Sequence, residues 1–453
     1  MFRGMRVFIV SVVCLFVLFF PRSVPQNEFP VLKVVIDPGH GGAWLLPRSQ
    51  HGDRYDVLSA SYLDDYRPGA NLRNMKEHKI VYNVGERVMQ ILKYTAPGGE
   101  FYKFERIAKK YGKINERISI VTMMSRPKGV DYEQGVKLPS DSADEDPNAL
   151  YRLFDYPDSN GVIQAGRITQ INKFSPHLVV SIHLALSGDP AYKAMNPILA
   201  APFPFLVQGL HYLRGKKTDR KFFDNSPLRN WFVEDERISA FRWFLSDVSQ
   251  YFTGYPLDEK LNIRENRFRG YLRNMVQWPY ADDPGWEAEA KLQKNYSPYS
   301  MNYKDVSPAG KFWDRERSKF ELYKRDGGEE GFGGDNAYAS YEIIRYILAS
   351  LKQSGAYNNS IVPGKPYVSI WAIPTHINAI NAYFELGYLQ RGPDRKILID
   401  HQREIAEGIA VGIYALLGGM EPHEGNFPHK PKGKRIDLQK YNITAEKSYF
   451  DVE

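Results

Sequence analysis

Short apolar runs and longer amphipathic stretches alternate along this chain. Compact apolar runs bounded by turn residues predict buried strands, and apolar residues that recur every three or four positions predict helices. The predicted strands are 33–37, 118–123, 178–183, 367–372 and 382–386. The predicted helices among them are 77–94, 341–351 and 402–417. This alternation predicts an α/β fold with a mostly parallel central sheet flanked by helices.

The alternation lapses in the middle of the chain. The segment 187–335 is rich in charged residues, aromatic residues, Pro and Gly, and only 236–252 has a helical pattern within it. We interpret it as a large insertion of mixed or irregular structure, which divides a core formed by 30–186 and 336–420. The remainder, 421–453, contains three prolines and several lysines and is expected to be an extended surface strap or a disordered end.

The first 25 residues have the pattern of a secretion signal. Arg3 and Arg6 precede the apolar run 7–20, which is too short to span a bilayer comfortably but suits a signal peptide. An uncleaved N-terminal anchor in the membrane is the alternative. The single cysteine, Cys14, lies inside this run, and Val13 before it does not suit a lipoprotein signal. The mature chain therefore has neither disulfides nor a zinc–thiolate site.

Composition narrows the class of protein further. The 453 residues are 43% hydrophobic and 25% charged, as is typical of a folded chain. The net charge is +7, and removal of the leader with its three basic residues leaves 57 basic against 53 acidic residues, or +4. Because a nucleic-acid-binding protein needs a pronounced basic stripe, we expect no nucleic-acid partner.

Two histidines end predicted strands. His40 follows the strand 33–37 after an abrupt Pro-Gly turn, and His183 is the last residue of the strand 178–183. In open α/β sheets the carboxyl ends of the strands form the ligand site, so both imidazoles are expected at one edge of the sheet. Glu77 opens the next helix on its core-facing stripe, and its carboxylate points back toward that edge. A catalytic zinc site needs three such protein ligands.

A fourth candidate is Glu385, which interrupts the apolar strand 382–386. A carboxylate there is unfavourable unless it is paired, bound to a metal or catalytic. The alternatives are an ion pair with Arg126 or Arg167 for Glu385, a core histidine for His183, and a dipole-stabilising role for Glu77. His78 is expected to face solvent.

Four blocks of sequence, in order along the chain, carry a resemblance to a known family. They are Ile36-Asp37-Pro38-Gly39-His40-Gly41-Gly42, Lys76-Glu77, Ser181-Ile182-His183 and Phe384-Glu385-Leu386-Gly387-Tyr388-Leu389. Together they resemble the N-acetylmuramoyl-L-alanine amidases, zinc enzymes that cleave peptidoglycan with an α/β domain. Weaker similarities are Ser125-Arg126 and Arg167, whose arginines we expect to form structural pairs. The resemblance covers 30–186 and 336–420.

The resemblance implies a mechanism. His40, Glu77 and His183 hold Zn²⁺, and a zinc-bound water attacks the amide that joins N-acetylmuramic acid to L-alanine. Glu385 acts as the general base and then as the general acid. The expected partner is peptidoglycan, and the expected location is the periplasm or cell envelope.

Three departures from the family pattern leave other functions open. Ala185 stands where the family usually has Asn, the segment between His40 and Glu77 is long, and the insertion is large enough for regulation by a protein partner. The alternatives are a catalytically inactive wall-binding module of the same fold and a zinc peptidase that acts on another amide.

Overall fold

A computed structural model describes residues 29–43, 52–56, 61–128, 148–186, 194–201, 203–215, 240–264, 334–357 and 359–441, the last with gaps at 360, 365, 369–372, 376 and 426. Its main sheet has the strand order β12-β11-β14-β10-β1-β7, with β13 also paired to β11. The four strands β7 (Ser119–Met124), β1 (Val31–Pro38), β10 (Leu178–Ala185) and β14 (Ile380–Tyr388) run parallel. The predicted α/β class and largely parallel sheet are confirmed.

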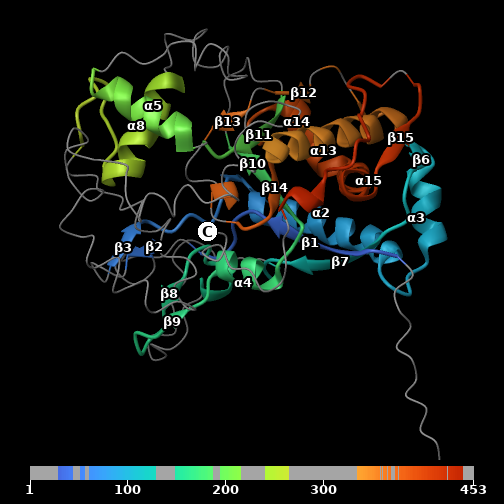
Figure 1. The fold of residues 1–453 in the computed structure, drawn as a ribbon, viewed down its shortest axis with the longest axis horizontal. Coiled ribbons are helices and arrows are strands. Elements are labelled where there is room, and N and C mark those ends of the chain that lie inside the picture. The colour runs from blue at the N-terminus through green and yellow to red at the C-terminus, as the bar shows by residue number, and fades with distance from the viewer. Residues whose placement is uncertain are drawn as a thin grey trace, which may run out of the picture.

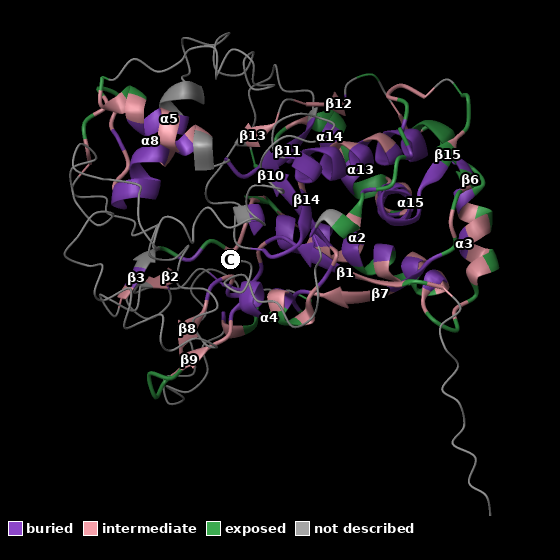
Figure 2. Cartoon of the chain, in the orientation of Figure 1, coloured by how far each residue is buried: buried purple, intermediate pink, exposed green. Residues whose placement is uncertain are grey.

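Alternate residues of these strands face two different layers of helices. Val34, Val180 and Phe384 pack into the large core with α2 (Glu77–Leu92), α13 (Gly334–Gln353) and α15 (Gln402–Gly418). Val35 and Val179 pack against α4 (Arg167–Phe174) instead. Helices α13 and α15 lie on one side of the sheet and α4 on the other (Figure 1). Strands β10 and β14 are buried along most of their length, as their continuous apolar sequence predicts, whereas β7 at the edge of the sheet is mostly half-buried (Figure 2).

The predicted helices 77–94, 341–351 and 402–417 correspond to α2, α13 and α15. Helix α2 ends earlier than predicted, since Lys93–Thr95 form a 3₁₀ turn, whereas α13 begins earlier, at Gly334. The structure adds α3 (Phe101–Ala108) and α14 (Gly392–Asp400). Each of these helices has only about two turns, which is too short for a clear apolar period in the sequence. Short 3₁₀ turns occur at Ala149–Tyr151, Ile373–Thr375 and Leu438–Tyr441.

The described parts of 187–335 include a strand and two helices. Strand β11 (Ala194–Leu199) pairs with β14 in the antiparallel sense and with β12 (Val362–Pro363) and β13 (Tyr367–Val368) in the parallel sense. The central sheet thus includes a strand from the segment we expected to be irregular. Helices α5 (Phe203–Leu213) and α8 (Ala240–Thr253) contact each other, and α8 corresponds to the helix predicted at 236–252. The rest of this segment lies outside the described residues.

The C-terminal segment forms a strap as far as Tyr441. Strand β15 (Met420–Pro422) pairs with β6 (Gly112–Ile114), and Ile436 and Tyr441 are buried in the large core. Residues 442–453 lie outside the described residues, as does the leader 1–25. No helix in the described part of the chain is both long and apolar enough to span a membrane.

Three short hairpins complete the secondary structure of the described residues. The hairpins are β2 (Asp53–Asp56) with β3 (Ser61–Asp64), β4 (Asn71–Leu72) with β5 (Met75–Lys76), and β8 (Tyr156–Pro157) with β9 (Ile163–Gln164). The second of these leads directly into α2 and so places Glu77 at the start of that helix.

Candidate metal centre

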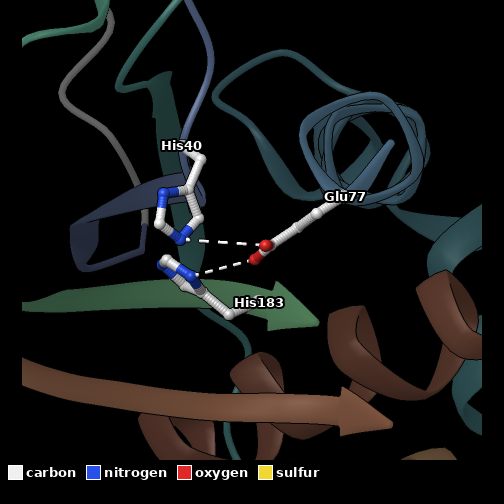
Figure 3. Close-up of side chains that lie close together, drawn as sticks. All are labelled: His40, Glu77 and His183. Atoms are coloured by element: carbon white, nitrogen blue, oxygen red, sulfur yellow. Dashed lines mark ion pairs between the residues drawn. The ribbon is translucent and has the colours of Figure 1, made fainter. Parts of the chain in front are cut away.

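Three side chains from different elements meet at the carboxyl ends of β1 and β10 (Figure 3). His40 lies on the turn after β1, Glu77 is the first residue of α2, and His183 lies near the end of β10. Gly39 N donates to Ile182 O at 2.8 Å, which ties the turn to β10. The backbone of His40 adopts a left-handed conformation, with φ 58°. Strained conformations of this kind concentrate at functional sites.

The ligand atoms are close enough to share one ion. One nitrogen or oxygen of each residue lies within 4.8 Å of the others. The Nε2 of His40 is 3.7 Å from Glu77 Oε2, and the Nδ1 of His183 is 3.1 Å from Glu77 Oε1. The two imidazole rings are 4.9 Å apart at their centroids and nearly perpendicular. Among the described residues, this is the one group of three or more His, Cys, Asp or Glu with such spacing.

Main-chain groups orient the ligands. The Nδ1 of His40 is 3.0 Å from Arg67 O, so Nδ1 donates to this carbonyl and Nε2 is left as the acceptor that faces Glu77. Glu77 Oε2 accepts from Ala70 N at 2.7 Å, and Oε1 accepts from Leu184 N at 2.9 Å. Outer contacts of this kind fix metal ligands in orientation and raise their affinity for the ion.

The ionisation states also suit a cation. Burial alone would raise the pKa of Glu77, but His40, His183 and the Leu184 amide outweigh it and lower that pKa to about 2. Burial lowers the pKa of His183, although Glu77 opposes the shift. The site therefore offers an anionic carboxylate and a neutral imidazole at neutral pH, which are the forms that bind metals.

The residues present fit a catalytic zinc ion. Two imidazoles and one carboxylate are an established donor set for catalytic zinc, with one position left open. Tetrahedral bonds of about 2.0–2.1 Å place neighbouring ligand atoms roughly 3.3 Å apart, close to the 3.1 and 3.7 Å separations here. Two glycines leave the space for these side chains. A Cβ on Gly39 would lie 2.3 Å from the His183 ring, and one on Gly69 would lie 2.8 Å from His40 Cβ.

We expect Gly39→Ala to weaken zinc binding by about 10- to 100-fold, because the added methyl displaces the imidazole of His183. Overpacking should also cost about 1–3 kcal/mol of stability. The measurement is a zinc titration against a competing chelator. Gly209→Ala is the matched control, since its methyl crowds the Val248 side chain at 2.7 Å between α5 and α8. Equal zinc affinity in the two variants would contradict the expectation.

Glu385 lies beside this group on the neighbouring strand. It is in register with His183 across the parallel β10–β14 pair, so both side chains project from the same face of the sheet. The residue is partly exposed, but its Oε2 is buried and accepts no hydrogen bond. Burial of the carboxyl group raises the pKa of Glu385 well above its usual range, and the charge of Glu77 raises it further. Environments of this kind are characteristic of general acids and bases.

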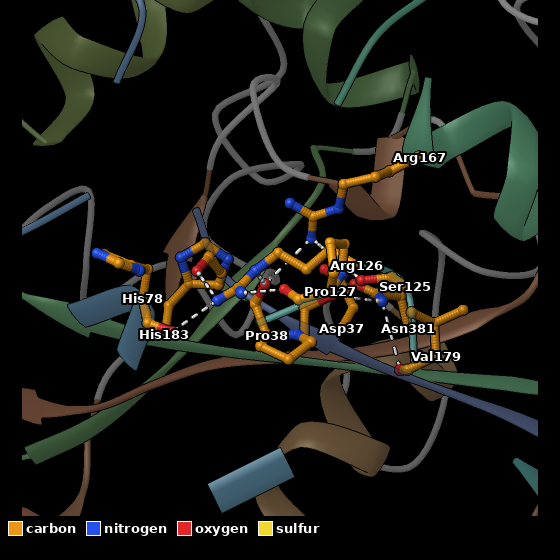
Figure 4. Close-up of polar contacts among 12 residues, drawn as sticks. Asp37, Pro38, His78, Ser125, Arg126, Pro127, Arg167, Val179, His183 and Asn381 are labelled. Carbon is orange, nitrogen blue, oxygen red and sulfur yellow. Dashed lines mark hydrogen bonds and ion pairs between the residues drawn. The ribbon is translucent and has the colours of Figure 1, made fainter. Parts of the chain in front are cut away.

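Arg126 and Arg167 bind groups other than Glu385 (Figure 4). Arg167 forms a buried ion pair with Asp37, and Ser125 Oγ donates to the same Asp37 oxygen at 2.5 Å. Arg126 donates to main-chain carbonyls. The expected structural pair is therefore confirmed for Arg167, whereas Arg126 binds main-chain carbonyls in place of a carboxylate. The other interpretation of Glu385, an ion pair with one of them, has no counterpart among the contacts of the described residues.

The Asp37–Arg167 pair predicts a pH-dependent contribution to stability. Burial raises the pKa of Asp37, but Arg167 and Ser125 outweigh it and hold that pKa below its ordinary value of 3.8. The stabilisation is fully present above pH 3.8 and is lost as the pH falls through the lower, folded-state pKa. We expect Asp37→Asn to cost about 3–5 kcal/mol at neutral pH, because Arg167 is left buried and unpaired. In urea unfolding, the difference from wild type should shrink below pH 3.8, and a constant difference would contradict this assignment.

One sequence-based expectation was wrong. His78 is buried, with 4% of its surface exposed, whereas we expected it to face solvent. Its carbonyl accepts from Arg126 Nη2, so the segment after β7 covers this side of α2. Of the other histidines, His401 lies 3.7 Å from Glu404. His51 and His376 lie outside the described residues.

Sequence inspection missed Tyr383 as a neighbour of the site and did not indicate what Arg126 binds. The ring of Tyr383 lies 4.6 Å from that of His183. The register between β10 and β14 offered a signal for Tyr383, because Ser181 pairs with Tyr383 and His183 with Glu385. No sequence pattern indicates the hydrogen bonds of Arg126, which go to main-chain carbonyls.

Comparison with known protein families found no match, and comparison with curated protein sequences found none either. Two solved structures that align with this chain are N-acetylmuramyl-L-alanine amidases called Ami1, the enzyme type that the sequence motifs resemble. The one from Mycobacterium smegmatis aligns over 84% of this chain and 94% of its own, with 12% identity and a TM-score of 0.31. The apo form from Mycobacterium abscessus aligns over 85% and 97%, with 13% identity and a TM-score of 0.32. TM-scores this low do not establish a common fold, and identities this low do not establish a common activity.

Proposed function

We propose that this protein is an exported zinc amidase that hydrolyses the bond between N-acetylmuramic acid and L-alanine in peptidoglycan. The observation that carries the proposal is the convergence of His40, Glu77 and His183 beside Glu385 at the carboxyl ends of the strands. Metal-assisted amide hydrolysis requires ligands for the ion and a group that moves the proton. Here the ligands would be two imidazoles and one anionic carboxylate, and the proton carrier would be a separate carboxyl group whose pKa is raised.

His40, Glu77 and His183 would hold the ion. When bound, zinc supplies Lewis acidity, which polarises the amide carbonyl and lowers the pKa of a coordinated water toward ~7. The low pKa of Glu77 keeps this ligand anionic, and its two main-chain hydrogen bonds hold it in place. The side chain of His40 is 31% exposed, so a substrate would reach the three residues from this side of the site.

Glu385 would move the proton. Its carboxylate takes a proton from the attacking water and then gives it to the departing amine nitrogen of L-alanine. The raised pKa of Glu385 makes it a stronger base than an exposed glutamate, and a bound cation offsets the repulsion from Glu77. Its in-register position next to His183 keeps the group one strand spacing from a ligand.

The leader supports export, and the substrate places the protein in the periplasm or cell envelope. An apolar run with basic residues before it, 7–20, is the basis for this part of the proposal. If the leader is not cleaved, it would anchor the protein in the membrane. The proposal also includes regulation, through the 187–335 segment and a protein partner.

A digest of purified sacculi tests the function. The protein without its leader, loaded with zinc or treated with a chelator, is incubated with sacculi, and the soluble products are identified by mass spectrometry. The proposal predicts free stem peptides with an N-terminal L-alanine, and their loss with chelator. Binding to sacculi without release would indicate the inactive wall-binding module. Release of a different fragment would indicate a zinc peptidase for another amide.

A further inference from the structure

The three segments that carry the candidate ligands are held together by a small set of hydrogen bonds. Strand β10 is tied directly to the His40 turn by Gly39 N and Ile182 O, and to Glu77 by Leu184 N. The turn and α2 are linked to each other on the outer side through 67–70, where Pro68 O accepts from Gly41 N at 3.4 Å and Ala70 O accepts from Glu77 N at 2.9 Å. Among the described residues, the side chain of Arg126 also links the turn to α2.

Arg126 bridges the neighbours of two ligands. Its Nη2 donates to Gly39 O at 3.0 Å and to His78 O at 2.7 Å, the residues next to His40 and Glu77. Its Nε donates to Pro38 O at 2.9 Å (Figure 4). One guanidinium therefore connects the turn after β1 to the first turn of α2. Strand β7, which carries none of the candidate ligands, contributes this bridge from its end.

The cost of placing Arg126 there indicates that it has a specific role. Its side chain is buried, with 3% exposed, and the neighbouring aspartate pairs with Arg167 instead. Burial and Arg167 lower the pKa of Arg126 only to about 10, so it remains a cation at neutral pH. A buried cation among carbonyls contributes little net stability. The planar guanidinium, held by Nε on Pro38 O, however, fixes the directions of the two Nη2 N–H groups that bind Gly39 O and His78 O, whereas the ammonium of a lysine rotates freely.

We propose that Arg126 is a positioning residue that fixes the separation of His40 and Glu77 and thereby sets the affinity of the site for zinc. The inference rests on the metal site within the proposed function, and not on the identity of the amide. The left-handed backbone of His40 strengthens the need for such a restraint, since a strained conformation of this kind persists only where its surroundings hold it. Arg126 holds the two carbonyls that precede it, those of Pro38 and Gly39.

The test compares Arg126→Gln and Arg126→Lys with Arg345→Gln. Arg345 donates to the buried Glu342 in α13 at 2.9 Å, away from the site, and its side chain is 13% exposed, so its variant controls for the loss of a largely buried arginine. Zinc affinity is measured by competition with a chromogenic chelator, and the stability of the metal-free proteins by urea unfolding. We expect Arg126→Gln to weaken zinc binding by about 10- to 100-fold, as is typical for outer contacts of metal ligands.

Arg126→Lys separates the bridge from the charge. Lysine keeps the positive charge but loses the Nε bond to Pro38 O and the fixed plane that aims Nη2 at both carbonyls, so the zinc affinity of this variant should stay at least about 10-fold below wild type. Arg345→Gln should lose stability and keep wild-type affinity. Wild-type affinity in Arg126→Gln, or full recovery in Arg126→Lys, would overturn the proposal. If the glutamine variant does not fold, the lysine variant alone decides.

The same experiment separates this inference from the proposed function. If the wild type binds zinc in an Arg126-dependent way but releases no stem peptide, the amidase proposal fails and the positioning role stands. If stem peptides are released and the Arg126 variants bind zinc like wild type, the amidase proposal stands and the positioning role fails. A wild type that binds no zinc contradicts both.

Discussion

Replacing Glu385 with glutamine is expected to lower the rate of stem-peptide release by about 100- to 10,000-fold, the usual contribution of a general acid–base group. The substitution keeps the shape of the side chain but removes the group that accepts and returns the proton. Zinc affinity should stay close to the wild-type value, because Glu385 lies outside the group His40, Glu77 and His183. The measurement is kcat/KM on purified sacculi, with zinc content determined on the same samples.

Glu342→Gln is the matched control for this prediction. Glu342 is also a buried glutamate whose pKa is raised by burial, but it accepts hydrogen bonds from Lys432 N and Gly433 N at the C-terminal strap. This variant should lose stability and keep its activity per folded molecule. If Glu385→Gln retained activity within a few-fold of wild type, another group would have to move the proton.

His183→Ala is expected to weaken zinc binding by more than ~100-fold, beyond the effect of losing an outer contact, and to abolish hydrolysis. The reason is that a site with His40 and Glu77 alone keeps only two of its three ligands. In the wild type, zinc at about 1,000 times its dissociation constant should raise the free energy of unfolding by about 4 kcal/mol. At the same zinc concentration, zinc would be at most about 10 times the dissociation constant of the variant, which should therefore gain no more than about 1.4 kcal/mol.

His177→Ala is the control at the opposite end of the same strand. The Nδ1 of His177 accepts from Lys33 N at 3.0 Å, far along β10 from the site, so its loss should affect stability and not zinc affinity. Zinc-dependent stabilisation of wild-type size in His183→Ala would show that the ion binds through other residues.

Much of the site could be predicted because its residues break local rules. His40 and His183 each follow an apolar strand, and parallel strands bring their carboxyl ends to one edge. Glu385 is also conspicuous, because it is a carboxylate within an otherwise apolar strand. The structure brings His40, Glu77 and His183 together as expected, while the catalytic role of Glu385 stays a prediction.

The rest could not be predicted because it depends on contacts without a sequence period. Arg126 binds backbone carbonyls, which every residue possesses, so no partner residue in the sequence indicates the contact. His78 was expected to face solvent because a helical pattern describes one packed face of α2, whereas the residues after β7 cover a second. Strand β11 contains Asn196 and Pro197, which obscure its apolar pattern, and its pairing with β14 is a tertiary effect.

Anomalous diffraction at the zinc absorption edge, from crystals of the zinc-loaded protein without its leader, tests the central claim most directly. The claim is that one ion is held by side chains from the turn after β1, the start of α2 and the end of β10. We predict a single strong peak within bonding distance of His40, Glu77 and His183, with Glu385 nearby but not coordinated. A peak held by other residues, or no peak between these three side chains, would contradict the account.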